Sequence, residues 1–145
     1  MKREKNNKGF SLVELIIVIA IMVILVAVIV PQYLKYVNNS KISVDVQTAS
    51  EMATAIDVAV ASRTGAATVF ASSTADTLSH AGITTVPASK YFGTAVTWTI
   101  SGNDEVGVQQ ITIQSSAGGS PSPTVYEIYP DPDNSSNGFH EKLKK

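Results

Sequence analysis

The chain offers few side chains whose type and spacing suit chemistry, and the best grouped of them are oxygen donors near the C-terminus. Asp131, Asp133 and Asn134 stand close together in the segment YPDPDNSSN. Calcium accepts carboxylate and amide oxygens as ligands. Two carboxylates in a Pro-rich segment are, however, more typical of a solvated turn than of a calcium site. The three residues are therefore only a weak calcium candidate, and no metal site is predicted.

Nucleophilic, redox and metal chemistry have little support elsewhere in the chain. The sequence contains no cysteine, which excludes a cysteine nucleophile, thiolate ligands and disulfides. Its two histidines, His80 and His140, are far apart, without a clustered acid nearby, so surface positions are expected for them. The G-x-S-x-G pattern of serine hydrolases is absent. We therefore expect neither an enzyme nor a bound cofactor.

Glu14 is the one ionisable residue whose position calls for a function. It lies at the start of an apolar segment, just before sixteen consecutive apolar residues, Leu15 to Val30. A helix over the 21 residues from Phe10 to Val30 reaches about 32 Å, the thickness of a bilayer's hydrocarbon core. A carboxylate in hydrocarbon is costly and usually marks a function or a partner. The plain alternative is that Glu14 lies at the membrane surface and has no role.

Four basic residues precede this segment: Lys2, Arg3, Lys5 and Lys8. By the positive-inside rule they place the N-terminus in the cytoplasm and the rest of the chain outside. No small-x-small cleavage site follows the apolar run, so the segment is expected to stay with the protein. After residue 9, 7 basic residues face 11 acidic ones, a net charge of −4. Such a body is a poor partner for nucleic acid, which needs clustered Lys and Arg.

The stretch KGFSLVEL, residues 8–15, resembles the processing motif of type IV pilins and the related pseudopilins. In that family a short basic leader ends in Gly, the next residue is usually Phe, and a Glu stands fifth counting from it. Gly9, Phe10 and Glu14 match these positions, and the apolar run and Pro31 also fit. The resemblance covers residues 1 to about 60. The chain departs from the many pilins that tie down their C-terminal region with a disulfide, because it has no cysteine.

The resemblance implies that a prepilin peptidase cuts between Gly9 and Phe10 and methylates the new α-amine of Phe10. It also implies that Glu14 meets the amine of a neighbouring subunit as a homo-oligomeric helical filament assembles. From the spacing alone, Glu14 lies about one helical turn beyond Phe10, so the two charges could also pair within one subunit. A carboxylate in a low-dielectric bundle is tolerated when it is paired. The implied partners are the peptidase, the assembly machinery in the membrane and further copies of this chain.

The elements that must position these residues are a long helix and a small sheet, an α+β fold. Pro31 is expected to kink the helix rather than end it. Beyond it, apolar residues continue at helical spacing to the end of the helix near Arg63. They are Leu34, Val37, Ala49, Met52, Ala53, Ile56 and Val60.

The rest of the chain predicts an antiparallel sheet of three or four strands, packed on the second half of the helix. Residues 66 to 93 are read as a connection with a short helix. Alternation at Val96, Trp98 and Ile100 predicts a first strand, followed by a turn at residues 101–104. Val106 and Val108 continue the alternation, and the phase change at Gln109-Gln110 predicts a β-bulge. A further strand is expected over residues 124–129, before a loose tail.

These predictions divide the chain into five parts. They are a leader (1–9), the transmembrane and fibre-core half of the helix (10–30), its amphipathic half (31–64), a connecting loop and sheet (65–129) and a C-terminal tail (130–145).

The function implied by the resemblance is that of a structural filament subunit. It is held in the cytoplasmic membrane as a single-pass precursor and later exposed at the cell surface. The filament would support adhesion, motility or DNA uptake, which the sequence does not rank. An alternative within the family is a major-type pseudopilin of a type II secretion or competence system. An alternative from another class is an unprocessed, single-pass anchored binding protein, for which Gly9 and Glu14 would be replaceable.

Overall fold

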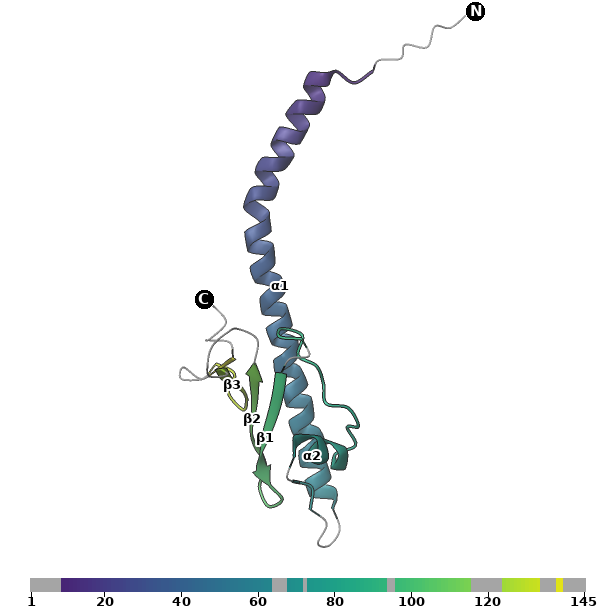
Figure 1. Ribbon diagram of the computed structural model, residues 1–145, viewed down its shortest axis with the longest axis vertical. Helices are drawn as coiled ribbons and strands as arrows, with labels where there is room; N and C mark the ends of the chain where they lie inside the picture. The colour runs from purple at the N-terminus through teal and green to yellow at the C-terminus, as the bar shows by residue number, and fades with distance from the viewer. Residues whose placement is uncertain are drawn as a thin grey trace, which may run out of the picture. The chain divides into compact units, whose positions relative to one another are not determined.

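The computed structural model describes residues 9–63, 68–71, 73–93, 96–115, 124–133 and 138–139. Within these ranges the elements follow one another in the order α1, α2, β1, β2, β3 (Figure 1). The chain divides into two compact units, residues 1–37 and 38–145. The fold is α+β, with a long N-terminal helix and a three-stranded antiparallel sheet, as the sequence predicts.

Helix α1 extends from Leu12 to Ser62 and passes through Pro31 without ending. A proline inside a helix removes one backbone hydrogen bond, but the neighbouring turns continue on both sides. The absence of glycine from Leu12 to Ser62 favours an uninterrupted helix, which compensates for the many β-branched Ile and Val residues of the first half. That Pro31 does not end the helix is therefore confirmed, and the kink itself stays a prediction.

In the first unit, no described side chain is buried. All residues from Gly9 to Tyr36 are exposed in the isolated chain. By length and composition, α1 is the one helix among the described residues that could cross a membrane, and its most apolar window has a mean hydropathy of 3.4. Burial of this surface must therefore come from outside the chain.

In the second unit, one face of α1 is buried. Its buried residues are Ile42, Asp45, Ala49, Met52, Ala53 and Ile56. The predicted stripe is confirmed from Ala49 to Ile56, where the spacing of three and four residues places side chains on one face. Leu34, which precedes this stripe, is 56% exposed, because the buried face begins only at Ile42.

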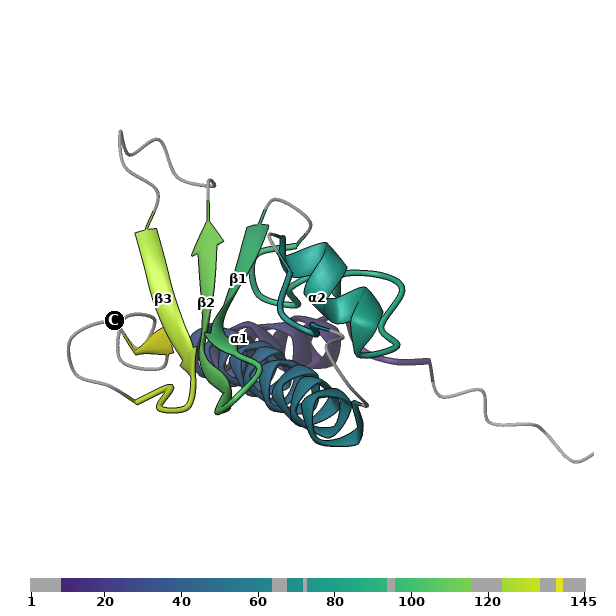
Figure 2. The same ribbon diagram turned by 90° about the horizontal axis from the view of Figure 1, so that it is seen from below.

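The sheet consists of β1 (Val96–Asn103), β2 (Gly107–Ser115) and β3 (Thr124–Tyr129), paired antiparallel in the order β1-β2-β3. Seen from below, the three strands lie side by side over the second half of α1, with α2 beside β1 (Figure 2). Trp98, Ile111, Ile113 and Ile128 fill the space toward the helix. These four residues and the stripe on α1 form one hydrophobic core.

The predicted bulge is confirmed. Ser101 pairs with Gln110 and Gly102 with Val108, which leaves Gln109 as an extra residue on β2. The extra residue reverses the alternation, so the inward positions change phase along the strand. The expected place of Val106 was wrong, because this residue lies in the β1–β2 turn and is 69% exposed. The side chain of Asn103 accepts the backbone N–H groups of Glu105 and Val106 and so stabilises that turn.

The predicted short helix in the connection is α2, Thr74–His80. It begins where the Ser73 hydroxyl accepts the N–H of Asp76, at 3.2 Å, as an N-cap. The Thr74 hydroxyl donates to the carbonyl oxygen of Trp98 at 2.9 Å, which joins α2 to β1.

Asp104, in the β1–β2 turn, ties the end of α1 to the connection. Its Oδ1 accepts the backbone N–H groups of Val69 and Phe70, at 2.9 and 3.2 Å, and its Oδ2 lies 3.5 Å from the guanidinium of Arg63. Desolvation raises the pKa of Asp104, but the two N–H donors, Arg63 and His80 outweigh it and hold that pKa below its ordinary value of 3.8. The turn, the helix end and the connection are therefore held by one carboxylate.

The C-terminal segment differs from the loose tail that the sequence suggests. Phe139 is fully buried, and Gly138 forms a parallel bridge with Glu127 of β3. The prediction is wrong at these two residues, because a single large aromatic side chain contributes enough burial to hold a short segment.

Candidate functional site

The predicted cleavage junction lies just outside the helix. Gly9 and Phe10 are not part of α1, which begins at Leu12. Phe10 is 89% exposed, and a Cβ placed on Gly9 would meet no atom within 4 Å. An enzyme can therefore reach this peptide bond from several sides. The glycine is not required by the fold, so any requirement for it must come from a partner.

Ser11 and Glu14 form the start of α1. The carbonyl oxygen of Ser11 accepts the first helical N–H, from Leu15, at 3.3 Å. Glu14 is the third residue of the helix, and its Oε2 accepts the backbone N–H of Ser11 at 3.0 Å. This is the carboxylate half of a capping box, in which an acidic residue satisfies a donor that the helix leaves unpaired. The pattern Ser-x-x-Glu at residues 11–14 predicts this capping box, but the sequence analysis did not include it.

The capping contact directs the Glu14 carboxylate at the site where the predicted cut would create a charge. The Ser11 nitrogen belongs to the peptide that joins it to Phe10. A chain that starts at Phe10 carries its α-amine on the residue immediately before that peptide. A carboxylate at a helix N-terminus is also favoured by the helix dipole. The arrangement can therefore accept a cation close to Phe10, within one chain or from a neighbour.

Glu14 stands alone on this part of the helix. From Phe10 to Leu34 it is the one Asp, Glu, Lys or Arg in the sequence. The surrounding side chains are apolar and exposed on every side of the helix. Once this surface leaves water, a single unpaired carboxylate becomes costly, and a cation becomes its natural partner.

The weak calcium candidate behaves as a turn where it is described. The Oδ1 of Asp131 accepts the N–H of Asp133 at 3.0 Å, the contact of an Asx turn. Asn134 lies outside the described residues. In the described ranges, no group of three or more His, Asp and Glu side chains is close enough to hold a metal ion. The calcium candidate therefore stays a weak prediction, and Asp131 and Asp133 contribute to a local turn.

One of the two histidines, His80, lies in the part of the chain that the structure describes. The Nδ1 of His80 lies 3.1 Å from the carbonyl oxygen of Val69, a structural contact with the connection. His140 lies outside the described residues.

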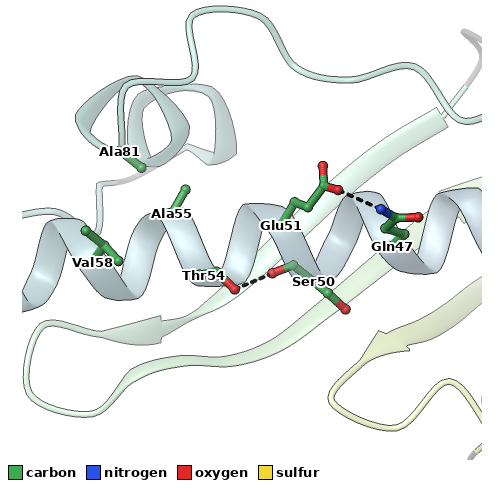
Figure 3. A pocket seen from close by; sticks show the side chains of 7 residues that line it. All are labelled: Gln47, Ser50, Glu51, Thr54, Ala55, Val58 and Ala81. Atoms are coloured by element: carbon green, nitrogen blue, oxygen red, sulfur yellow. Dashed lines mark hydrogen bonds between the residues drawn. The ribbon is translucent and has the colours of Figure 1, made fainter.

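An open pocket follows the exposed face of α1 near Ala81, and Figure 3 shows its lining side chains. Its carboxylate, Glu51, accepts a hydrogen bond from the Gln47 amide at 3.0 Å. The hydroxyls of Ser50 and Thr54 donate to carbonyl oxygens of the same helix. The carboxylate and the two hydroxyls of this lining are therefore each hydrogen-bonded within α1.

Comparison with known proteins places the start of the chain in a defined group. The family described as "Prokaryotic N-terminal methylation motif" matches residues 5–30. These residues include the junction, Glu14 and the apolar half of α1.

Curated relatives extend the similarity. A type IV major fimbrial protein FimA of Dichelobacter nodosus is 33% identical over 104 residues, which cover 68% of this chain and 67% of that protein. A second FimA of the same organism is 45% identical over 51 residues, 35% of this chain and 33% of that protein. A fimbrial protein of Pseudomonas aeruginosa is 41% identical over 56 residues, 39% of this chain and 36% of that protein. No solved structure gives a significant match.

These relatives are named as fimbrial proteins, which are structural. The match to the first FimA covers 68% of this chain, so it is not confined to the methylation motif and the apolar helix and reaches the region of the antiparallel sheet. The chain therefore belongs to the type IV pilins and is a structural protein rather than an enzyme.

Proposed function

We propose that this chain is a structural subunit of a type IV pilus-like filament and is made as a membrane-anchored precursor. The precursor is inserted with its basic N-terminus in the cytoplasm, cut after Gly9 by a prepilin peptidase and methylated on the α-amine of Phe10. The processed copies then polymerise through the apolar half of α1. The observation that carries the proposal is the combination of an accessible Gly9–Phe10 bond with an apolar helix surface that the chain itself does not bury.

The apolar surface supports a role both in the membrane and in a filament. About 30 Å of apolar helix satisfies its backbone internally and fits the hydrocarbon core. The same side chains can pack against copies of the chain once they leave the lipid. A head-to-tail contact of this kind does not close on itself and so propagates as a filament.

Glu14 is proposed to select the register of each added copy. Its carboxylate is paired most favourably when a Phe10 amine reaches it, so a copy that slips along the helix leaves both charges in an apolar surrounding. The cap that Glu14 forms with Ser11 keeps the carboxylate at the end of the helix where the amines gather.

The experiment separates the charge of Glu14 from its capping role. Glu14→Gln retains the cap, because Gln also serves at this position of a capping box, but it removes the charge. We expect this variant to be processed normally and to yield at least about tenfold fewer filaments than the wild type. Without the charge, copies in the wrong register are nearly as stable as copies in the right one. Glu51→Gln is the matched control, since Glu51 is exposed on the same helix and hydrogen-bonded to Gln47. Equal filament yields from all three proteins would refute the role of the Glu14 charge.

Gly9→Ala tests processing by itself. The structure has room for the added methyl group, so the fold should be unaffected. We expect the precursor to accumulate uncut in the membrane and filaments to be lost. Normal filaments built from uncut Gly9→Ala chains would favour an anchored protein that needs no peptidase. Processing with only short membrane-associated assemblies from the wild type would favour the pseudopilin alternative.

A further inference from the structure

The second unit contains a buried carboxylate that filament assembly through the first half of α1 does not use. Asp45, on the buried face of α1, is 1% exposed. Its Oδ1 accepts the N–H of Lys90 at 2.6 Å, and its Oδ2 accepts the hydroxyl of Ser89 at 2.6 Å and the N–H of Tyr91 at 3.1 Å. A buried carboxylate is tolerated when such donors replace its water. All three donors belong to one turn, more than forty residues away along the chain.

Asp45 organises that turn. The Ser89 hydroxyl, which donates to Asp45, also accepts the N–H of Phe92 at 2.9 Å. The carbonyl oxygen of Ser89 accepts the N–H of Gly93 at 3.0 Å, and Gly93 has a φ of +79°, a value that glycine adopts without strain. The turn is therefore closed by its own backbone and is fixed to α1 by one carboxylate.

The turn in its fixed form presents two aromatic rings to the C-terminal segment. The ring centroids of Tyr91 and Phe92 lie 6.2 and 5.9 Å from that of Phe139. Tyr126 of β3 contributes a third ring, 5.8 Å from Phe139. These are the centroid separations of favourable aromatic contacts. Phe139 is fully buried among them, next to the bridge between Gly138 and Glu127.

We propose that Asp45 is the positioning residue of a non-covalent clasp that fixes the C-terminal segment to the sheet. Asp45 holds the turn at Ser89–Gly93, the turn holds Tyr91 and Phe92 in place, and these rings together with Tyr126 retain Phe139. The clasp supplies, in a chain without cysteine, a C-terminal attachment. It acts within the second unit and does not depend on how the first unit assembles.

The clasp predicts that a change at Asp45, which bonds to the turn, also affects Phe139, which contacts the aromatic rings of that turn. Asp45→Asn keeps the shape of the side chain but replaces one acceptor oxygen with an amide group that cannot accept the turn's N–H or hydroxyl donors. The turn then loosens, and with it the surroundings of Phe139. A carboxylate that only stabilised its own helix would leave the C-terminal segment unchanged.

Native-state hydrogen exchange of the full-length protein in detergent micelles measures this directly, because it reports local opening segment by segment. With Asp45→Asn, we expect exchange to rise about tenfold both at Lys90–Phe92 and at Gly138–Phe139. The matched control is Asp57→Asn, the same change on the same helix. Asp57 accepts the N–H of Val108 at 2.8 Å and has no described contact with the clasp. We expect this control to raise exchange near Val108 and to leave Gly138–Phe139 within about twofold of the wild type.

A weaker variant covers the case in which Asp45→Asn does not fold. Ser89→Ala removes one donor from the carboxylate and the acceptor for Phe92, and it should give the same pattern with a smaller rise. Phe139→Leu, which removes the ring, should abolish the additional effect of either variant at the C-terminal segment. The clasp is refuted if Asp45→Asn or Ser89→Ala loosens the turn alone, or if Asp57→Asn loosens Gly138–Phe139 equally.

Discussion

The two units of the chain, residues 1–37 and 38–145, treat apolar side chains in opposite ways. In the first unit every large apolar residue from Phe10 to Val30 is exposed. In the second, apolar residues of α1 and of all three strands form one core. Among the described residues, no buried side-chain nitrogen or oxygen lacks a hydrogen-bond partner. The helix α1 therefore has an exposed apolar surface in the first unit and a face buried in a core in the second.

The difference shows where each unit obtains its stability. The second unit buries its own apolar surface, which removes that surface from water at a gain of about 25 cal/mol per Å². The first unit obtains no such gain from its own chain, so lipid or other copies must provide it. A subunit that moves from a membrane into a filament must exchange lipid contacts for protein contacts on one surface. That surface should have no packing within the chain, whereas the rest of the fold should be stable by itself.

The largest predicted effect lies in the core of the second unit. Ile111→Ala removes a fully buried side chain from β2 and leaves a cavity, so we expect the free energy of unfolding to fall by about 4 kcal/mol. Urea denaturation followed by fluorescence of Trp98, the chain's one tryptophan, measures it. Ile19→Ala, the same change in the first unit, should leave this transition unaltered. A comparable loss from Ile19→Ala would contradict the independence of the two units.

The same charged substitution at two similarly exposed valines, one in each unit, should have very different effects. Val23 is 67% exposed and Val106 is 69% exposed. Val23→Lys puts an ammonium in the middle of the apolar helix, at a cost of about 3 kcal/mol in hydrocarbon, and should weaken membrane insertion and remove most of the filaments. Val106→Lys, in a solvated turn, should change stability by less than about 0.5 kcal/mol and leave filaments intact. Membrane fractionation and filament yield provide the two readouts.

The smallest predicted effect is a pH dependence confined to the second unit. The pKa of Asp104 is lower in the folded protein than its ordinary value, so its contribution to stability is complete above pH 3.8. It is lost as the pH falls through the lower folded pKa. The melting temperatures of the wild type and of Asp104→Asn should therefore differ most near neutral pH and converge only as the pH falls through the folded pKa, which lies below 3.8. A constant difference at all these pH values would show that Asp104 acts only by packing.

Sequence patterns predicted the elements whose residues repeat at a fixed period. The stripe from Ala49 to Ile56 and the phase change at Gln109 are such cases, because periods of 3.6 and 2.0 residues follow directly from helix and strand geometry. The short α2 and the strand at Thr124–Tyr129 were also found. The match at Gly9, Phe10 and Glu14 was read from a resemblance, which the family comparison supports through residues 5–30.

Contacts between distant segments were missed because single residues carry them without a period. Phe139 lies in a polar segment that reads as a tail, and only its three aromatic neighbours show that it is buried. Asp45 reads as one more polar residue on a helix, until the turn at Ser89 supplies its donors. The cap between Ser11 and Glu14 was different, since Ser-x-x-Glu was available in the sequence and was overlooked.

The unburied apolar helix is proposed to become a filament core after the chain is cut at Gly9–Phe10. Intact mass and N-terminal sequencing of the protein sheared from cell surfaces test this proposal. We predict a chain that starts at Phe10 and is heavier by one methyl group than the unmodified sequence from that residue. A chain that still starts at Met1 and is found only in membranes would contradict the proposal.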